Sequence, residues 1–103
     1  MFVPFNLYLL NTVNLFVATA HERYLSMKMY VGNLIYNMTE RELKNLFSPF
    51  GEVLSSLIIT DQYTRQSKNI GYVKMAIHEE AKIAERELNG KKINDRYLVV
   101  RKA

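Results

Sequence analysis

From residue 27 onward, the sequence predicts an α+β fold, with one antiparallel sheet of four strands and two helices on a single face of it. Two kinds of pattern support this prediction. Four short segments alternate apolar residues with other residues, as half-buried strands do. Two further segments repeat their apolar residues at helical spacing, which indicates helices with one buried stripe.

The first half of this region contains a strand, a helix and a second strand. Residues 28–33 alternate as a strand. Thr39 and Glu42 then form a capping box, in which each side chain accepts a hydrogen bond from the backbone N–H of the other residue. The Pro-Phe-Gly sequence at 49–51 ends the helix. The apolar stripe of this helix consists of Leu43, Leu46, Phe47 and Phe50. Val53 to Thr60 is rich in branched residues and predicts the second strand.

The second half repeats the pattern. Asp61 to Ser67 is a polar loop, and Asn69 to Met75 is the third strand. A second helix runs from about Glu79 to Leu88, after a turn that contains His78, and Tyr97 to Arg101 forms the last strand. The inner face of this helix consists of Ala81, Ala84 and Leu88. The order is βαββαβ, which predicts a ferredoxin-like sandwich with one open sheet face.

Composition sets limits on function. A chain of 103 residues with 49% apolar and 23% charged residues is a globular domain of ordinary make-up. Its net charge of +4 is compatible with a polyanionic partner. The absence of cysteine excludes disulfides and thiolate metal sites. The only histidines, His21 and His78, have no second ligand at metal spacing, so we expect no metal and no cofactor.

Residues 1–26 form an apolar extension to the domain at 27–103, and the first twenty residues carry no charge. Three interpretations remain open. Met27 is the true start, or the extension is a membrane or export signal that ends in the small residues 18–20, or it packs on the domain. Interspersed asparagines and a proline lower its hydrophobicity, so we do not expect a membrane partner and we expect a cytoplasmic location. If retained, it is a candidate surface for a protein partner or self-association.

Two short motifs carry the functional argument. The first is Met29-Tyr30-Val31-Gly32-Asn33-Leu34, and the second is Lys68-Asn69-Ile70-Gly71-Tyr72-Val73-Lys74-Met75. In each motif a tyrosine lies on the parity opposite the aliphatic residues, so both rings are expected on the open face of the sheet. Exposed tyrosines with nearby lysines suit stacked bases and a phosphate backbone. The nearby lysines are Lys28, Lys68 and Lys74.

From Met27 to its end, the sequence resembles an RNA recognition motif domain. The two motifs match the hexamer and octamer of that family, and the sequence between them fits its first helix and the loop before its third strand. The resemblance suggests that this chain is similar to the small single-domain members of the family, which are typical of bacteria and organelles. It implies single-stranded RNA as the partner, and single-stranded DNA in vitro.

The resemblance also implies roles for individual residues. Tyr30 and Tyr72 are similar to the two stacking aromatics of the family. Lys68 occupies the basic position of the octamer and would pair with a phosphate. Lys74 shares the open face with Tyr72, and Arg101 would pair with the backbone or stack on a base. Weaker candidates are Lys28, Arg65 and Lys102.

Four positions depart from the pattern of the family. Asn69 replaces the usual glycine, and Ile70 replaces an aromatic that packs between the sugars of stacked bases. Ile70 keeps the apolar contact and loses the π-face. Met75 replaces a last aromatic, and Leu57 is apolar where a polar residue is common. We therefore expect RNA binding at about micromolar dissociation constant.

Other function classes are weighed against RNA binding. The apolar Ile70 and Leu57 on the open face favour a protein-interaction module as the alternative. Catalysis is not expected, because no nucleophile–base pair appears. Acylphosphatases share this strand order but need an arginine and a phosphate-binding loop, and residues 32–37 contain no arginine and no glycine run.

Overall fold

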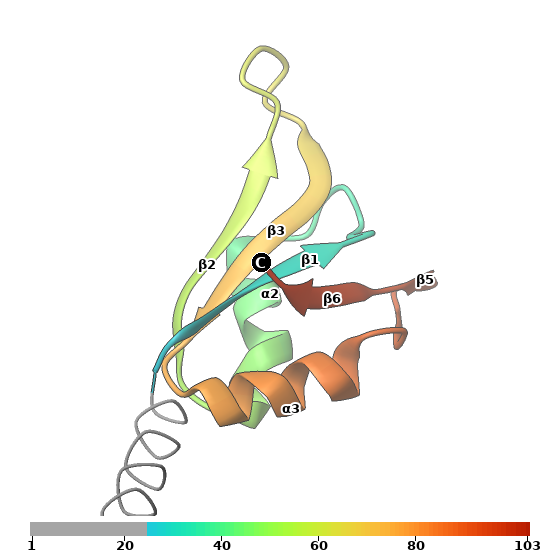
Figure 1. Ribbon diagram of the computed structural model, residues 1–103. Helices are drawn as coiled ribbons and strands as arrows, with labels where there is room; N and C mark the ends of the chain where they lie inside the picture. The colour runs from blue at the N-terminus through green and yellow to red at the C-terminus, as the bar shows by residue number, and fades with distance from the viewer. Residues whose placement is uncertain (1–24) are drawn as a thin grey trace, which may run out of the picture.

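The computed structural model describes residues 25–103, which form one sheet, two helices and a small hairpin (Figure 1). The expectations for residues 1–24, including the extension and its signal or start-site interpretations, lie outside the described residues. The elements are β1 (Met27–Gly32), α2 (Glu40–Phe47), a 3₁₀ turn η1 (Ser48–Phe50), β2 (Val53–Thr60), β3 (Ser67–Met75), α3 (His78–Leu88), β4 (Lys92–Ile93), β5 (Arg96–Tyr97) and β6 (Val99–Lys102).

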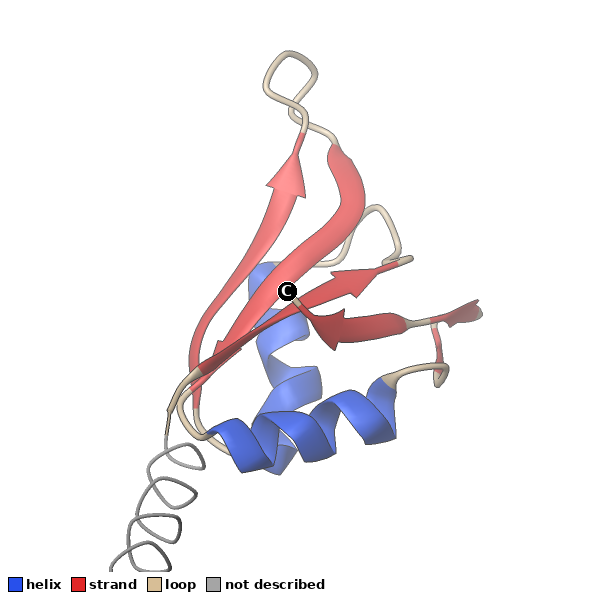
Figure 2. Ribbon diagram, viewed as in Figure 1, coloured by secondary structure: helices blue, strands red, loops and turns tan. Residues whose placement is uncertain are grey.

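The large sheet has the strand order β2-β3-β1-β6, and all its neighbouring strands are antiparallel. Helices α2 and α3 both lie on one side of it, so the other face is uncovered by any helix of the described chain (Figure 2). The expected α+β architecture and its βαββαβ order are thus confirmed.

Helix α2 begins with the expected capping box. The Glu42 N–H donates to Thr39 Oγ1 at 3.0 Å, and the Thr39 N–H donates to Glu42 Oε1 at 2.9 Å. These reciprocal bonds satisfy two N–H groups that have no partner within the helix. The helix then buries Leu43 and Phe47 completely against the sheet. Its last turn tightens into the 3₁₀ turn that contains Pro49.

Helix α3 begins at His78, so this histidine is the first residue of the helix and not a turn residue before it. The boundary differs from the expectation because Ile77 is the last residue with extended backbone angles. The inner face is as expected, with Ala81, Ala84 and Leu88 all buried. Two alanines on that face let the helix axis approach the sheet closely, since each fills little space.

The core lies between the sheet and the helices. Its largest fully buried side chains are Phe47, Met29, Leu34, Leu43, Met75, Val31, Val73 and Val100. Gly71 lies on the same side of β3. A Cβ at that position would lie 2.6 Å from the backbone oxygen of Leu57 and 2.9 Å from Leu43 Cδ2. Any side chain there would therefore push α2 and β2 away from β3.

The end of the chain differs from the expected single strand over 97–101. The structure forms a β4–β5 hairpin, and β6 begins only at Val99. The two residues of the hairpin turn, Asn94 and Asp95, have φ values of 52° and 63°. Two consecutive left-handed residues define the tight turn that suits a two-residue hairpin, and Asn and Asp tolerate this conformation well. Asn94-Asp95 is therefore a local turn signal that the expected single strand does not take into account.

Side chains from the helix layer cover backbone donors at both edges of the sheet. The three hydrogen bonds run from Ile58 N–H to Glu40 Oε2 at 3.0 Å, from Val100 N–H to Asn89 Oδ1 at 2.9 Å, and from Lys102 N–H to Glu85 Oε2 at 3.2 Å. An exposed edge strand normally offers such donors to another strand. These bonds therefore occupy three of the backbone donors at the two edges of the sheet.

Candidate nucleic-acid interface

Four side chains form one line across the open face of the sheet. The strand register pairs Leu57 with Tyr72, Tyr72 with Tyr30, and Tyr30 with Arg101. Because direct register partners point to the same face, these residues lie side by side on β2, β3, β1 and β6. We call this line the aromatic row. It places the two motif tyrosines at its centre, on the two central strands.

The two rings lie outside the core and contact each other. Their centroids are 5.9 Å apart with an interplanar angle of 71°, an edge-to-face arrangement. Arg101 Cζ lies 5.3 Å from the centroid of Tyr30, and Lys28 Nζ lies 4.9 Å from that of Tyr72. Each tyrosine therefore has a cation within cation–π range. Both rings are partly exposed, so neither is buried in the hydrophobic core.

The glycine of the hexamer makes room for the first ring. A Cβ on Gly32 would lie 2.8 Å from Tyr30 Oη and 2.9 Å from its Cε1. The Tyr30 ring therefore lies along its own strand, over the backbone of Gly32. Any larger residue at position 32 would clash with the ring, so the glycine of the motif allows the tyrosine ring to lie close to the sheet backbone.

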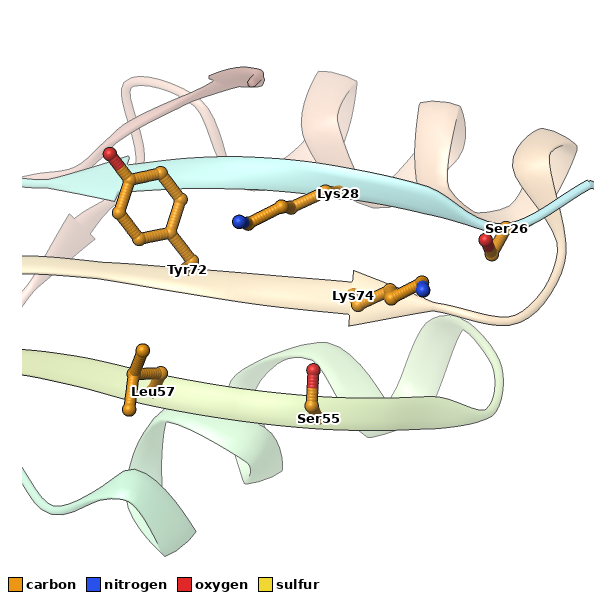
Figure 3. Close-up of a pocket in the computed structure, with 6 residues that line it drawn as sticks. All are labelled: Ser26, Lys28, Ser55, Leu57, Tyr72 and Lys74. Carbon is orange, nitrogen blue, oxygen red and sulfur yellow. The ribbon is translucent and has the colours of Figure 1, made fainter.

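A second line of side chains runs parallel to the aromatic row. Lys28 pairs with Lys74, and Lys74 pairs with Ser55 on the edge strand. These residues border a hollow of 380 Å³ that extends to Tyr72 (Figure 3). The six residues that line the hollow are Ser26, Lys28, Ser55, Leu57, Tyr72 and Lys74. The expected neighbours Lys28, Lys74 and Tyr72 thus come together at one place.

On the other side of the aromatic row the surface is apolar. Ile70 pairs with Gly32, and Gly32 pairs with Val99, which is 36% exposed. Ile70 is partly exposed and follows the alternation of Tyr72, so it stands where the resemblance places a residue that contacts sugars. The three neighbouring lines are therefore cationic, aromatic and apolar in turn.

Lys68 lies beyond a break in the alternation. Asn69 has a left-handed φ of 66°, and the pairing of β2 with β3 is irregular between Ile58 and Thr60. The face of Lys68 consequently does not follow from counting residues back from Tyr72. Lys68 is exposed and near enough to Asp61 to act on its charge. The weaker candidates Arg65 and Lys102 are exposed in the β2–β3 loop and at the end of β6.

The loop between β2 and β3 is organised by Asp61. Its Oδ1 accepts from the N–H of Thr64 at 2.9 Å and from that of Tyr63 at 2.8 Å. These two bonds, with a smaller attraction from Lys68, lower the pKa of the Asp61 carboxyl below its ordinary value. Tyr63 is 85% exposed at this loop, so its ring is free of the core.

An arginine that sequence reasoning missed ties the first motif to the hairpin. Arg96 Nη2 donates to Asn33 Oδ1 at 2.6 Å, and Arg96 Nε lies 3.1 Å from both oxygens of Asn33. Asn33 Nδ2 in turn donates to the Tyr97 carbonyl at 2.9 Å. These bonds hold the end of β1 against β5. The sequence gives no signal for this contact, because sixty-three positions separate the two residues.

The strands are strongly asymmetric in charge. The four strands of the large sheet contain five basic residues and no Asp or Glu. The basic residues are Lys28, Lys68, Lys74, Arg101 and Lys102. Within residues 25–103, no three His, Asp or Glu side chains gather as metal ligands, and no helix is long and apolar enough to span a membrane. A surface with rings and cations offers stacking and anion binding.

Comparison with known proteins agrees with this geometry. Residues 29–99 match the model of the RNA recognition motif. Glycine-rich RNA-binding protein 4, mitochondrial, of Arabidopsis thaliana is 36% identical over 78 residues, which cover 76% of this chain and 57% of that protein. The U11/U12 small nuclear ribonucleoprotein 31 kDa protein of the same plant is 36% identical over 72 residues, or 70% of this chain and 28% of that protein. The match thus spans about half of the first relative and less of the second.

Solved structures are similar as well. The crystal structure of RNA Binding Protein PG1 has a TM-score of 0.73 and 38% identity, covering 75% of this chain and 93% of that one. The structure of the Rna15 RRM with bound RNA (GU) has a TM-score of 0.67 and 28% identity, covering 74% and 81%. The chain belongs to the RNA recognition motif family, a class of non-catalytic RNA-binding domains. The resemblance to bacterial single-domain members stays a prediction.

Proposed function

We propose that this chain binds single-stranded RNA by stacking two bases on Tyr30 and Tyr72. The aromatic row carries the proposal, because it presents both rings in register on the two central strands. Every base has a π-face, so each stack adds about 1–3 kcal/mol with little dependence on sequence. With two rings and an isoleucine in place of a third, we expect a dissociation constant of about one micromolar.

The charges of the strands support the same partner. Five basic residues and no acidic ones lie on the strands of the large sheet, which favours a polyanion. Binding to single strands should therefore weaken with salt, with a slope of about 0.7 in log–log terms for each phosphate contact. Single-stranded DNA should also bind in vitro, because stacking does not require the 2′-hydroxyl.

The test is a titration of a short fluorescent oligoribonucleotide with the full chain. Tyr30→Ala and Tyr72→Ala should each weaken binding about tenfold. Tyr36→Ala is the matched control, since this tyrosine is 76% exposed but lies in the loop between β1 and α2. Thermal unfolding of each variant checks that the fold is intact. If both sheet variants bind RNA as tightly as Tyr36→Ala does, stacking on these rings is refuted.

One observation favours a protein-interaction module as the second candidate. Leu57 is 50% exposed at the β2 end of the aromatic row, and it provides apolar area that RNA binding does not require. A peptide that docks on this face would depend on Leu57 and Ile70 more than on the charges. Loss of peptide binding in Leu57→Ser with RNA binding unchanged would support this second role.

Residues 1–26 call for a separate measurement. Mass spectrometry of the protein made in its own cells distinguishes the open interpretations. A start at Met27 keeps β1 whole, because that strand begins at this residue, and leaves a compact cytoplasmic RNA binder. A retained extension would have to be buried on the domain, in a partner or by self-association, because twenty uncharged residues would otherwise promote association.

A further inference from the structure

The hollow beside Tyr72 offers a binding site that base stacking alone does not use. Its lining comes from β1, β2, β3 and the residue before β1, and its volume is 380 Å³. This falls in the range of about 300–1,000 Å³ that is usual for pockets that hold small molecules. Figure 3 shows Lys28 reaching along β1 toward Tyr72, with Lys74 on the adjacent strand and the Ser55 hydroxyl next to it on β2.

The charges around the hollow are repulsive in the free protein. Lys28 and Lys74 are direct register partners on β1 and β3. Like charges directly opposite each other destabilise a sheet. Within residues 25–103, neither lysine takes part in an ion pair, and the lining contains no Asp or Glu. Figure 3 shows that the two side chains run in opposite directions along their strands, Lys28 toward Tyr72 and Lys74 toward Ser26. An anion bound in the hollow would add an attraction to these positive charges.

The polar groups around the hollow are also suited to an anion. Each ammonium group offers three N–H donors, and it accepts no hydrogen bond. The hydroxyls of Ser26 and Ser55 rotate, so each is able to donate to a bound oxygen. Together these groups can surround a phosphate, with Leu57 and Tyr72 as apolar walls.

We propose that the hollow holds one phosphodiester of the bound RNA, on the β2 side of the nucleotide that stacks on Tyr72. This inference rests on the proposed function. The aromatic row has rings on β1 and β3 but ends in Leu57 on β2, so a strand that continues toward β2 meets no third ring. It meets Lys74 and Ser55 instead, which bind a phosphate and leave the adjoining base unread.

The experiment combines a modified RNA with a double variant of the full chain. A neutral methylphosphonate replaces each linkage of a short oligouridylate in turn, which removes one charge without removing a base. In the wild-type protein, one linkage should be sensitive, with binding about fivefold weaker. In Lys28→Met/Lys74→Met, this sensitivity should vanish at that linkage. The control Lys82→Met/Lys91→Met removes the same amount of charge far from the open face and should keep the sensitivity at that linkage.

Three other outcomes overturn the proposal. The first is an equal loss at every linkage in the wild-type protein and in Lys28→Met/Lys74→Met. The second is displacement of the RNA by a glutamate-rich peptide that shifts the Lys28, Ser55 and Lys74 amide signals, which would make the hollow a protein site. The third is failure of the wild-type protein to bind any oligonucleotide, which refutes the proposed function as well and so differs from the first two.

A stability measurement separates this role from a structural one. Because like charges on directly paired strand residues do not stabilise a sheet, Lys28→Met/Lys74→Met should unfold at the same temperature as the wild type or higher. Weaker phosphate sensitivity together with unchanged or increased stability supports a ligand site. A clear fall in unfolding temperature, with the sensitive linkage still sensitive in the folded variant, would mean that the lysines support the fold and would overturn the subsite.

Discussion

The two faces of the large sheet have opposite compositions although the same strands form both. On the helix face, Met29, Val31, Val73 and Met75 are completely buried. On the open face, the alternating residues Lys28, Tyr30, Tyr72 and Lys74 are charged or aromatic and at least partly exposed. Strand alternation thus divides the molecule into a side that supplies stability and a side that is free to bind.

Charge divides the molecule along the same line. The strands of the large sheet contain no acidic residue, whereas α2 and α3 together contain six glutamates and four basic residues. The modest net charge of +4 therefore hides a basic sheet and an acidic helix layer. What the comparison teaches is that net charge alone understates how well one face of a small domain suits a polyanion.

The largest expected effect is a loss of stability from a substitution on the helix face. Phe47→Ala should lower the free energy of unfolding by about 3–5 kcal/mol, because this fully buried ring would leave a cavity between α2 and the sheet. Denaturant unfolding measures the loss. The open-face substitution Leu57→Ala should cost less than about 1 kcal/mol, since half of that side chain is already exposed. Similar losses for the two variants would contradict the division between faces.

Adding a single methyl group at Gly71 tests how tightly the helix face is packed. Gly71→Ala should destabilise the fold by about 1–3 kcal/mol, because its Cβ would lie 2.6 Å from a backbone oxygen that cannot move freely. Ser55→Ala on the open face of the next strand is the control, with an expected change within about 0.5 kcal/mol. Thermal unfolding decides, and a stable Gly71→Ala variant would show that α2 is less tightly packed than the structure indicates.

On the open face, a gain of function sharpens the comparison. Ile70→Phe should tighten RNA binding about fivefold, because it returns a π-face to the position between the stacked bases. The unfolding temperature should change little, since the side chain is partly exposed. Ile70→Val serves as the control that keeps the apolar contact alone. A titration in which phenylalanine and valine bind RNA equally well would place the RNA elsewhere on the sheet.

The smallest effect concerns the β2–β3 loop. The pKa of Asp61 is lowered in the folded protein, so its ionised form stabilises the loop above the ordinary carboxyl pKa of about 4, and this contribution is lost as the pH falls through the lowered value. The amide signals of Tyr63 and Thr64 should then move together with a midpoint below pH 4. Asp61→Asn should remove that titration, and a midpoint above pH 4 would contradict the proposed cause.

Most of the fold could be predicted because its signals are local. The capping box needs only Thr39 and Glu42, and the stripes of the two helices are visible as apolar spacing. The end of the chain was harder, because a two-residue strand leaves too few residues for a periodic pattern. Asn94 and Asp95 form the turn of the β4–β5 hairpin, which contains Tyr97 of the expected final strand and which no alternation reveals.

The site divides in the same way. The parity of Tyr30, Tyr72 and Lys74 follows from the alternation within unbroken strands. The structure places Tyr72 and Lys74 on the open face, and the register sets Tyr30 beside Tyr72. Lys68 lies beyond the left-handed Asn69, where alternation no longer applies. Ser26 and Ser55 carry no signal in the sequence, because a serine on a strand is ordinary until a hollow forms beside it.

The sequence by itself determined which residues face away from the core, because side-chain direction along a strand repeats every two residues. Only the tertiary structure decided which of those residues become neighbours. Strand register sets Leu57, Tyr72, Tyr30 and Arg101 in one line and brings Lys28 opposite Lys74. Register depends on how the helices and the sheet pack together, and that packing joins residues that lie far apart in the chain.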